Sequence, residues 1–491
     1  MIRTLLLVVT MALASLPHAA AQDAPAQVPP SQPRKPNIIF ILADDLGWAD
    51  VGCYGSTYYE TPNIDRLASQ GMRFTSGYSA GPNCTPTRAA IMSGQYGART
   101  GIFTVGSIDR FDWRSRPLAP PENLQNLPLN LRIVPQPLKD AGYVTGMFGK
   151  WHLGQKGEFH PSQRGFDEAV ATAGKHFDFK TDPAVEHPQG QYLADFLTDR
   201  SVDFIQRNKD KPLFLYLPHF GVHTPRQAKP GLIEKFKAKP GVGGHNDPVY
   251  AAMLYSVDES LGRIMATLDE LKLADDTLVI FSSDNGGVGG YQREGIEKGN
   301  DITDNAPLRG GKGMLYEGGI RVPFIFRFPG KIKAGVTSDA PIISVDLLPS
   351  FVELARAKSP DQPLDGVSLV SHLHGKPLER EDIFWHFPGY LGAPGDDAWR
   401  TKPVGVIRSG DYKLLEWYED GTVELYNLKT DIGEKHNLAQ KQPELAKSLR
   451  AKLVSWREET GARMPAKQDP QKSQAGGKRQ RQRRAADGED E

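Results

Sequence analysis

The sequence predicts an α/β fold: a large, mostly parallel central sheet flanked by helices, followed by a smaller C-terminal antiparallel sheet plus helix. Three observations predict it. Strand-like and helix-like segments alternate between residues 37 and 330, which is typical of a parallel sheet covered by helices. One helix-like segment carries a long apolar stripe. Beyond residue 382 the chain instead contains short β-rich runs close together.

Four short apolar runs are expected strands of the central sheet. They are Asn37–Ala43, Leu213–Leu217, Leu278–Phe281 and Pro323–Phe328. Between the second and third runs, apolar side chains from Tyr250 to Leu271 recur in alternating steps of four and three. This spacing predicts an amphipathic helix over residues 249 to 272 that packs on the sheet. Residues 344–357 are predicted to form another helix.

The C-terminal part has a different pattern. Residues 382 to 428 contain short β-rich runs, and residues 419–421 (Glu-Asp-Gly) lie where a hairpin turn is expected. Regularly spaced apolar residues from Leu445 to Trp456 mark a final helix. Four side chains here are candidate sugar-stacking contacts, although core packing is the more frequent role for each. They are Trp385, His386, Tyr390 and Trp399.

Both ends of the chain look different from the rest. Residues 1–21 are predicted to be a signal peptide, because their apolar stretch is too short for a comfortable membrane span and ends in small residues. Residues 22–36 are a Pro-rich linker and residues 466–491 a disordered tail. The basic cluster 478–484 in this tail has the alternative role of gripping an anionic polymer. We therefore expect an exported protein, periplasmic or secreted, without stable membrane insertion.

Length and charge limit the possible domain organisation and function of the rest of the chain. At 491 residues it is long for one core, so we expect a main domain at 37–360 and a C-terminal α+β subdomain at 361–465. The chain has 59 basic and 59 acidic residues. This balance argues against a nucleic-acid-binding protein.

Polar residues follow four of the expected strands. They are Asp44 and Asp45 after the first, Lys150 and His152 after YVTGMFG, His223 after LFLYLPHFG, and Asp284 with Asn285 after LVIFSS. Ligands of open α/β sheets bind outside the carboxyl ends of the strands, so these groups are expected to share one crevice.

Four of these residues form an oxygen-only ligand set. Asp44, Asp45, Asp284 and Asn285 suit a hard cation such as calcium or magnesium and suit zinc or copper poorly. The alternative is that each pair caps a helix or forms a turn, as such pairs often do.

Cys84 lies at an expected helix start, in GPNCTPTRAAIMSGQ. Pro86 suits a first helical turn, where the N–H groups and the dipole favour an anion. Arg88, one turn on, lies on the same face. The alternative is a buried thiol or a disulfide with Cys53, the other cysteine of the chain.

Five segments resemble, in order, the motifs of type I formylglycine-dependent sulfatases of the alkaline phosphatase superfamily. They are ADDLGWAD, CTPTRAAIMSG, GKWHLG, SSDNGG and LRGGKGMLYEGGIRVP. The resemblance extends over residues 37 to 330 and includes bacterial enzymes that remove sulfate from polysaccharides. It implies that a formylglycine-generating enzyme oxidises Cys84 to formylglycine. Cys53 would then be a free, buried thiol.

The resemblance also implies roles for individual residues. A divalent cation, calcium or alternatively magnesium, would lie on Asp44, Asp45, Asp284, Asn285 and modified residue 84. Arg88, Lys150, His152, His223 and Lys312 match catalytic positions, and Lys150, His223 and Lys312 would contact the sulfate. The hydrated aldehyde would attack sulfur, with Asp284 accepting a proton. His223, together with Lys312, would protonate the departing alcohol, and His152 would take the second hydroxyl's proton to regenerate the aldehyde. Alternatives are a strand-end surface pair for Lys150 and His152, a turn for His223 and a flexible loop for Lys312.

The implied activity is hydrolysis of sulfate monoesters on a carbohydrate of galactose or N-acetylgalactosamine type. Two alternatives stay open: a phosphate or phosphonate monoester hydrolase of the same superfamily, and a secreted calcium-dependent glycan-binding protein. His176 is a further candidate sulfate contact, whereas His219 is expected to be structural.

Overall fold

The computed structural model describes residues 34–296, 301–380, 382–392 and 398–468. The predicted signal peptide, most of the linker and the tail beyond residue 468 lie outside the described residues. The described residues from Lys35 onward form one compact unit. None of the helices described is both long enough and apolar enough to cross a membrane.

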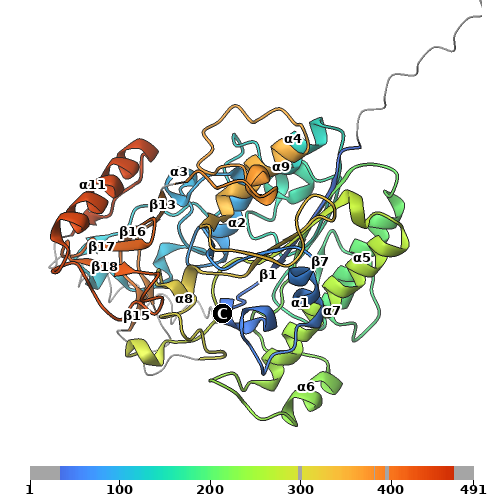
Figure 1. Ribbon diagram of the computed structural model, residues 1–491, viewed down its shortest axis with the longest axis horizontal. Coiled ribbons are helices and arrows are strands. Elements are labelled where there is room, and N and C mark those ends of the chain that lie inside the picture. Colours follow the sequence, from blue (N-terminus) through green and yellow to red (C-terminus); the bar gives the residue numbers. More distant parts are fainter. Residues whose placement is uncertain (1–33, 297–300, 381, 393–397, 469–491) are drawn as a thin grey trace, which may run out of the picture. The chain divides into compact units, whose positions relative to one another are not determined.

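The described part of the chain forms a nine-stranded central sheet with the order β11-β2-β10-β9-β1-β8-β5-β6-β7 (Figure 1). Its strands are β1 (Asn37–Ala43), β2 (Met72–Phe74), β5 (Val144–Gly149), β6 (Glu168–Thr172), β7 (Thr181–Asp182), β8 (Leu213–Pro218), β9 (Thr277–Ser283), β10 (Phe324–Arg327) and β11 (Val336–Ser338). Strands β9, β1, β8, β5 and β6 are parallel neighbours. The predicted fold class is therefore confirmed.

Strand β1 shows why the sequence forms a central parallel strand. Its seven residues are all buried, and it pairs with β8 on one side and β9 on the other. Ile39 and Ile41 join the hydrophobic core on one face of the sheet, while Ile38, Phe40 and Leu42 join the core on the other. A strand covered on both faces needs apolar side chains at every position, which NIIFILA supplies.

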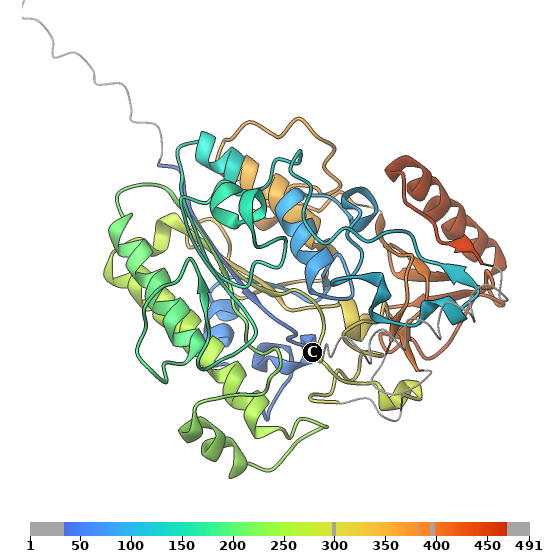
Figure 2. The same cartoon turned by 180° about the vertical axis from the view of Figure 1, so that it is seen from behind.

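Helices cover both faces of the sheet (Figures 1 and 2). One core contains α1 (Pro62–Ser69), α5 (Leu193–Arg207), α6 (Pro230–Lys237) and α7 (Pro248–Glu270). The other contains α2 (Cys84–Ser93), α4 (Pro135–Asp140), α9 (Leu347–Leu354) and α10 (Val370–Leu373). Helix α7 confirms the helix predicted over 249–272, and the Asp247 side chain caps it by accepting from the N–H groups of Val249 and Tyr250.

Strand β10 differs from its parallel neighbours. It runs antiparallel to both β9 and β2. After β9 the chain makes a long excursion at the carboxyl edge of the sheet and re-enters the sheet from that same edge, so its direction is reversed. This excursion contains Lys312.

The C-terminal part forms a four-stranded antiparallel sheet in the order β13-β16-β17-β18. Its elements are β13 (Asp382–Phe387), β16 (Val404–Ser409), β17 (Tyr412–Trp417), β18 (Val423–Asn427) and the final helix α11 (Pro443–Thr460). Residues 418–422 join β17 to β18, where the hairpin turn was predicted. The remaining elements are β3 (Gly77–Tyr78), β4 (Leu118–Ala119), β12 (Ile342–Ile343), β14 (Leu391–Gly392), β15 (Trp399–Thr401), β19 (Ala466–Lys467), α3 (Gly97–Thr100) and α8 (Glu317–Ile320).

The predicted start of the disordered tail needs a correction. Residues 466 and 467 form β19, which pairs antiparallel with β4. Gln468 adds backbone contacts there, since its N–H donates to the carbonyl oxygen of Pro117. The segment has few apolar residues and was therefore predicted to be disordered. Its pairing with β4 needs only backbone groups, which the side chains do not report.

A buried ionic network joins the C-terminal sheet to the main sheet. The Lys413 ammonium of β17 lies 2.9 Å from Glu317 Oε1 and 2.8 Å from Glu434 Oε1, and all three side chains are inaccessible to solvent or nearly so. Glu317 also accepts from Arg321 Nε at 2.6 Å and from the Tyr78 hydroxyl at 2.8 Å. Glu317 begins α8, five residues after Lys312, so the network fixes one end of the Lys312 excursion.

Replacing Lys413 by methionine should strongly destabilise the protein. The change removes one cation and leaves two carboxylates buried beside each other, which costs about 3–5 kcal/mol. The loss should be smaller at acidic pH, where protonation neutralises the carboxylates. Urea unfolding measures it. The matched control is Lys429→Met, which removes an exposed ammonium 3.8 Å from Asp411 and should leave the midpoint unchanged. Equal urea midpoints for Lys413→Met and Lys429→Met would show that the buried ionic network contributes little to the stability of the protein.

Candidate active site

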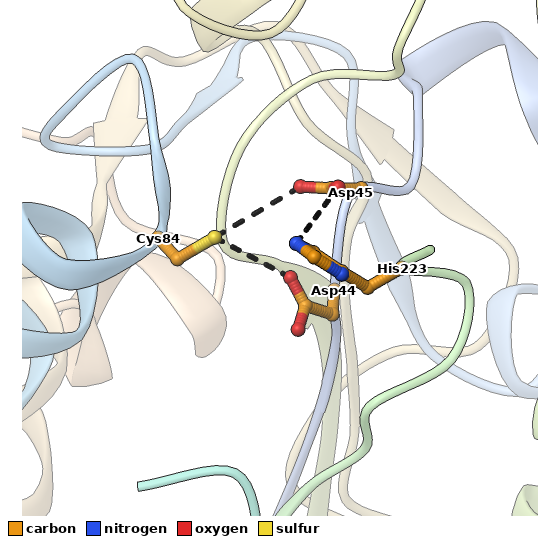
Figure 3. A group of neighbouring side chains, drawn as sticks. All are labelled: Asp44, Asp45, Cys84 and His223. Carbon is orange, nitrogen blue, oxygen red and sulfur yellow. Dashed lines mark hydrogen bonds and ion pairs between the residues drawn. The ribbon is translucent and has the colours of Figure 1, made fainter. Parts of the chain in front are cut away.

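The predicted site residues meet at the carboxyl edge of the central sheet. Asp44 and Asp45 directly follow β1, and Asp284 and Asn285 directly follow β9. Cys84 is the first residue of α2, and its Sγ lies 3.5 Å from Asp44 Oδ1 and 3.9 Å from Asp45 Oδ1 (Figure 3). Figure 3 shows that the side chains of Asp44, Asp45, Cys84 and His223 come from three different segments and face one another. The side chains expected to meet at the strand ends therefore do so.

Three cationic side chains offset the three buried carboxylates. Arg88 donates from Nε and Nη2 to Asp284 Oδ2, at 2.9 and 2.7 Å. Lys150 Nζ lies 2.7 Å from Asp44 Oδ2, and Lys312 Nζ lies 2.7 Å from Asp45 Oδ2. Each of the three cationic side chains thus forms an ion pair with a different carboxylate of the predicted site.

These charges shift the pKa values of the carboxyl groups in opposite directions. Burial by itself raises the pKa of Asp45, but the charges of Lys312, His223 and Lys150 outweigh it and hold that pKa below its usual value. Burial, and then the charge of Asp44, raise the pKa of Asp284 in spite of Arg88. Crowded carboxylates of this kind favour an additional cation.

Asn285 indicates where a cation fits. Its Nδ2 donates to Asp45 Oδ1 at 2.9 Å. Its Oδ1 is buried and, among the described residues, has no hydrogen-bond partner. An unpaired buried acceptor is costly, and here it lies beside a ligand set made of carboxylate and amide oxygens. The donor chemistry fits a hard divalent cation. The Cys84 thiol and His223 also lie close enough to Asp44 and Asp45 to complete a metal site.

The environment of Cys84 disfavours the reactive thiolate form of its side chain. The side chain is 1% exposed, and Lys150 Nζ lies 3.6 Å from Sγ. Burial, followed by the charge of Asp284, raises the thiol pKa well above its usual value. A thiol held in its protonated form is a poor nucleophile.

Two histidines complete the edge. The Asp44 carbonyl oxygen accepts from the Val222 N–H at 2.8 Å, which ties the turn that carries His223 to β1. His223 Nδ1 lies 2.6 Å from the Thr224 carbonyl oxygen, and Nε2 lies 3.7 Å from Asp45 Oδ2. Burial lowers the pKa of His223 to about 4. His223 therefore forms a hydrogen bond within its own turn and also lies beside Asp45, so its part in the turn does not remove it from the site.

His152 occupies an unusual backbone conformation. Its φ of +62° is in the left-handed region, as is the φ of +64° at Asp45. Such strain in residues other than glycine is often found at functional sites. Burial, with the charges of Lys150 and Arg88, lowers the pKa of His152 well below its usual value. The imidazole is therefore neutral and able to accept a proton.

The glycines of RGGKG allow close packing of the Lys312 segment. A Cβ on Gly311 would lie 2.0 Å from the Gly289 carbonyl oxygen. The Tyr291 hydroxyl donates to the Lys312 carbonyl oxygen at 2.8 Å. Lys312 is therefore held in place by its neighbours, which argues against the alternative of a flexible loop lysine.

The two cysteines, His219 and His176 differ in burial and in the contacts they make. Both cysteines are described and carry free thiols, but Cys53 is only partly buried, contrary to the expectation of a buried thiol. His219 is fully buried and hydrogen-bonded to Ser260, as expected for a structural residue. His176 is buried behind His223, with Nε2 2.8 Å from the His223 carbonyl oxygen. It therefore braces the turn, which its sequence context AGKHFDF did not reveal.

The aromatic candidates mostly have structural roles. Trp385 is buried and donates to the Ser79 carbonyl oxygen at 2.8 Å. His386 is hydrogen-bonded to the Tyr418 hydroxyl, and Tyr390 donates to Glu419. Trp399 is partly buried and lines a hollow together with Trp417.

Asp50 is a supporting residue that sequence reasoning missed. It is fully buried and accepts from the Gly47 N–H at 2.9 Å, the Tyr250 hydroxyl at 2.5 Å and the Thr303 hydroxyl at 2.6 Å. It thereby fixes the loop that follows Asp45. The signal was its place in ADDLGWAD.

Comparisons with known proteins agree with this geometry. The sulfatase family profile matches residues 36–357. The chain belongs to the sulfatase family. It is a sulfatase, a sulfuric ester hydrolase. A second profile, N-sulphoglucosamine sulphohydrolase C-terminal, matches residues 311–459.

The relatives of this sulfatase match it over most of their length. A sulfatase of Formosa agariphila is 36% identical, with 86% of this chain and 89% of the relative covered. The N-acetylgalactosamine-6-O-sulfatase of Bacteroides thetaiotaomicron is 31% identical, with 86% and 93% covered. The crystal structure of Ps i-CgsB in complex with k-i-k-neocarrahexaose superposes with a TM-score of 0.72 at 31% identity, covering 86% of this chain and 93% of that chain.

Proposed function

We propose that this sulfatase is an exported enzyme that removes sulfate from a sulfated carbohydrate, with formylglycine made from Cys84 and one bound calcium ion. The position of Cys84 carries the proposal. Its side chain points from the N-terminus of α2 into a buried group of carboxylates and lysines, where an unmodified thiol has no evident use. Converted to a hydrated aldehyde, residue 84 would supply a hydroxyl to attack sulfur and a second one to expel the sulfate.

The cation would be held by the oxygen ligands that surround residue 84. These are Asp44, Asp45, Asp284, Asn285 and the modified residue itself. The unpaired Asn285 Oδ1 and the three neighbouring carboxylates support this ligand set. When bound, calcium, or alternatively magnesium, would stabilise negative charge on the sulfate oxygens.

The other residues would bind the sulfate and move protons. Lys150 and Lys312 would hold sulfate oxygens while charge spreads over them. Arg88 would fix Asp284, the candidate acceptor of the proton from residue 84. His223, with Lys312, would protonate the departing alcohol; for His223 this requires that the negative charge of the bound sulfate first raise its pKa from the low value that burial gives it. His152 would accept the later proton, since its neutral imidazole has an unprotonated ring nitrogen.

The relatives support a carbohydrate substrate. One is named an N-acetylgalactosamine-6-O-sulfatase and another was solved with a neocarrahexaose. We therefore propose a sulfated galactose or N-acetylgalactosamine unit as the substrate. Maturation would require a formylglycine-generating enzyme as a partner, and the predicted signal peptide supports export to the periplasm or the medium.

Two other functions have less support. A phosphonate monoester hydrolase shares the fold, with a TM-score of 0.60, at 19% identity. A glycan-binding protein without catalysis would have no use for the buried set around Cys84. The sulfatase profile matches residues 36–357 and a sulfatase relative is 36% identical, which favours sulfate ester hydrolysis over the phosphonate alternative.

Parallel assays with an aryl sulfate and the matching aryl phosphate test the proposal. We expect kcat/KM to be at least about 10²-fold higher for the sulfate ester, because the site must stabilise the particular charge distribution of the sulfuryl transition state. Mass spectrometry of the tryptic peptide that contains residue 84 should show an aldehyde in place of the thiol. A preference for phosphate, or an active preparation that contains only unmodified cysteine, would refute the proposal.

A further inference from the structure

Two hollows lie beside His152. The Lys156 hollow has a volume of about 420 Å³, and its lining includes Thr85, Asn126, Lys156 and Phe159. The Lys180 hollow has a volume of about 300 Å³, and its lining includes Lys150, Thr172, Lys180 and Asp182. Both volumes fall in the range of small-molecule binding sites, roughly 300–1,000 Å³.

The two hollows share a wall. His152 and Gln155 line both of them. The other lining residues come from different segments, which are residues 85–159 for the Lys156 hollow and mainly residues 171–182 for the Lys180 hollow. Space is therefore available on both sides of His152. An enzyme that acts only at chain ends needs its reaction centre at the closed end of a pocket. Here, by contrast, the space continues on both sides of His152.

The lining of the Lys156 hollow suits a sugar. Thr85 is 2% exposed, and its hydroxyl has no hydrogen-bond partner within the described part of the chain. Gln125 and Asn126 add amide groups, and Phe159 adds an aromatic ring. Hydroxyl-bearing ligands with apolar faces need this combination of hydrogen-bonding groups and apolar surface.

The charges of the hollows indicate an anionic chain. Lys156 and Lys180 are exposed, one in each hollow. Lys150 also lines the Lys180 hollow, but its charge is paired with Asp44 at 2.7 Å, and Asp182 is the acidic residue of the hollow. A neutral protein that concentrates lysines beside its reaction centre favours an anionic substrate.

We propose that the two hollows bind the sugar units on either side of the sulfated unit, so that the enzyme removes sulfate from internal positions of an anionic polysaccharide. This inference rests on the proposed function. It adds the mode of action, which is attack within a chain rather than at its end. It also assigns Lys156 and Lys180 to binding of the neighbouring units.

Product analysis of defined hexasaccharides tests the mode of action. The probes are chondroitin 6-sulfate and carrageenan hexasaccharides, with an aryl sulfate as the reference substrate. After brief digestion, tandem mass spectrometry locates the first sulfate that is lost. We expect loss from internal units in at least one series. Loss only from one chain end, or hydrolysis of the aryl sulfate without attack on either series, would overturn the inference.

Charge-removing variants test the two hollows separately. Lys156→Gln and Lys180→Gln should each lower the ratio of kcat/KM for the hexasaccharide to kcat/KM for the aryl sulfate about fivefold, as expected for one partly exposed ion pair. Lys447→Gln, on the exposed side of α11, is the matched control and should leave the ratio unchanged. An unchanged ratio in both hollow variants would refute the inference. A wild-type protein that releases no sulfate even from the aryl ester would refute the proposed function as well.

Discussion

Replacing Cys84 by alanine should lower sulfatase kcat by at least about 10⁴-fold, the scale on which loss of a covalent nucleophile is felt. The variant would keep Arg88, Lys150 and Lys312 in place, because Asp284, Asp44 and Asp45, respectively, hold these side chains. It would lack any group able to form the covalent bond to sulfur. Initial rates with an aryl sulfate, measured on metal-loaded protein, give the effect.

Stability separates this loss from misfolding. The Cys84 side chain is small, so its truncation should cost no more than about 1–2 kcal/mol, and the thermal unfolding temperature should stay close to that of the wild type. Cys53→Ala is the matched control, since that thiol lies outside the site and should be dispensable for catalysis. An alanine-84 variant that retains substantial turnover would rule out residue 84 as the nucleophile.

Replacement by serine tests the modification itself. If the host enzyme accepts only cysteine, Cys84→Ser carries a plain hydroxyl. Attack by that hydroxyl would leave a stable sulfate ester, because no second hydroxyl is present to expel the sulfate. We expect at most one turnover, followed by a mass increase on residue 84. Sustained turnover with unmodified serine would contradict this mechanism.

The sequence predicted the site better than it predicted the surroundings of the site. Asp44, Asp45, Asp284 and Asn285 directly follow strands that are recognisable from their apolar runs. Their convergence follows from a parallel sheet, in which carboxyl ends share an edge. Cys84 and Arg88 could be predicted for a similar reason. Cys84 lies at a recognisable helix start, and Arg88 lies one helical turn further on.

Residues whose positions depend on long-range packing were harder to predict. His176 braces the His223 turn from a segment 47 residues away, and no local pattern reports such a contact. The reversed direction of β10 depends on where a long excursion re-enters the sheet. The pairing of β19 with β4 uses backbone groups and therefore leaves little trace in the side chains.

Removing the divalent cation should lower kcat/KM by about 10³-fold, because a bound metal ion contributes several kcal/mol of charge stabilisation. Lys150 and Lys312 would still pair with Asp44 and Asp45, so chelation should leave the protein folded. Calcium added to the chelated protein should restore activity. It should also raise the unfolding temperature, because at 100 times its Kd a ligand stabilises the folded state by about 2.7 kcal/mol. Full activity after exhaustive chelation would exclude a catalytic cation.

Asp45→Asn identifies the ligand set through the same measurements. Asparagine keeps the size of the side chain but removes the negative charge of the Asp45 carboxylate. One oxygen of this carboxylate lies 2.7 Å from Lys312 Nζ, and the other accepts a hydrogen bond from Asn285 at 2.9 Å. Activity should fall to the level of the chelated wild type, and added calcium should no longer raise the unfolding temperature at concentrations that saturate the wild type. Asp203→Asn, on α5, makes the same change in an exposed carboxylate paired with Arg207 and should preserve both responses. A normal calcium response in Asp45→Asn would remove Asp45 from the ligand set, because a hard cation loses affinity with each carboxylate that is neutralised.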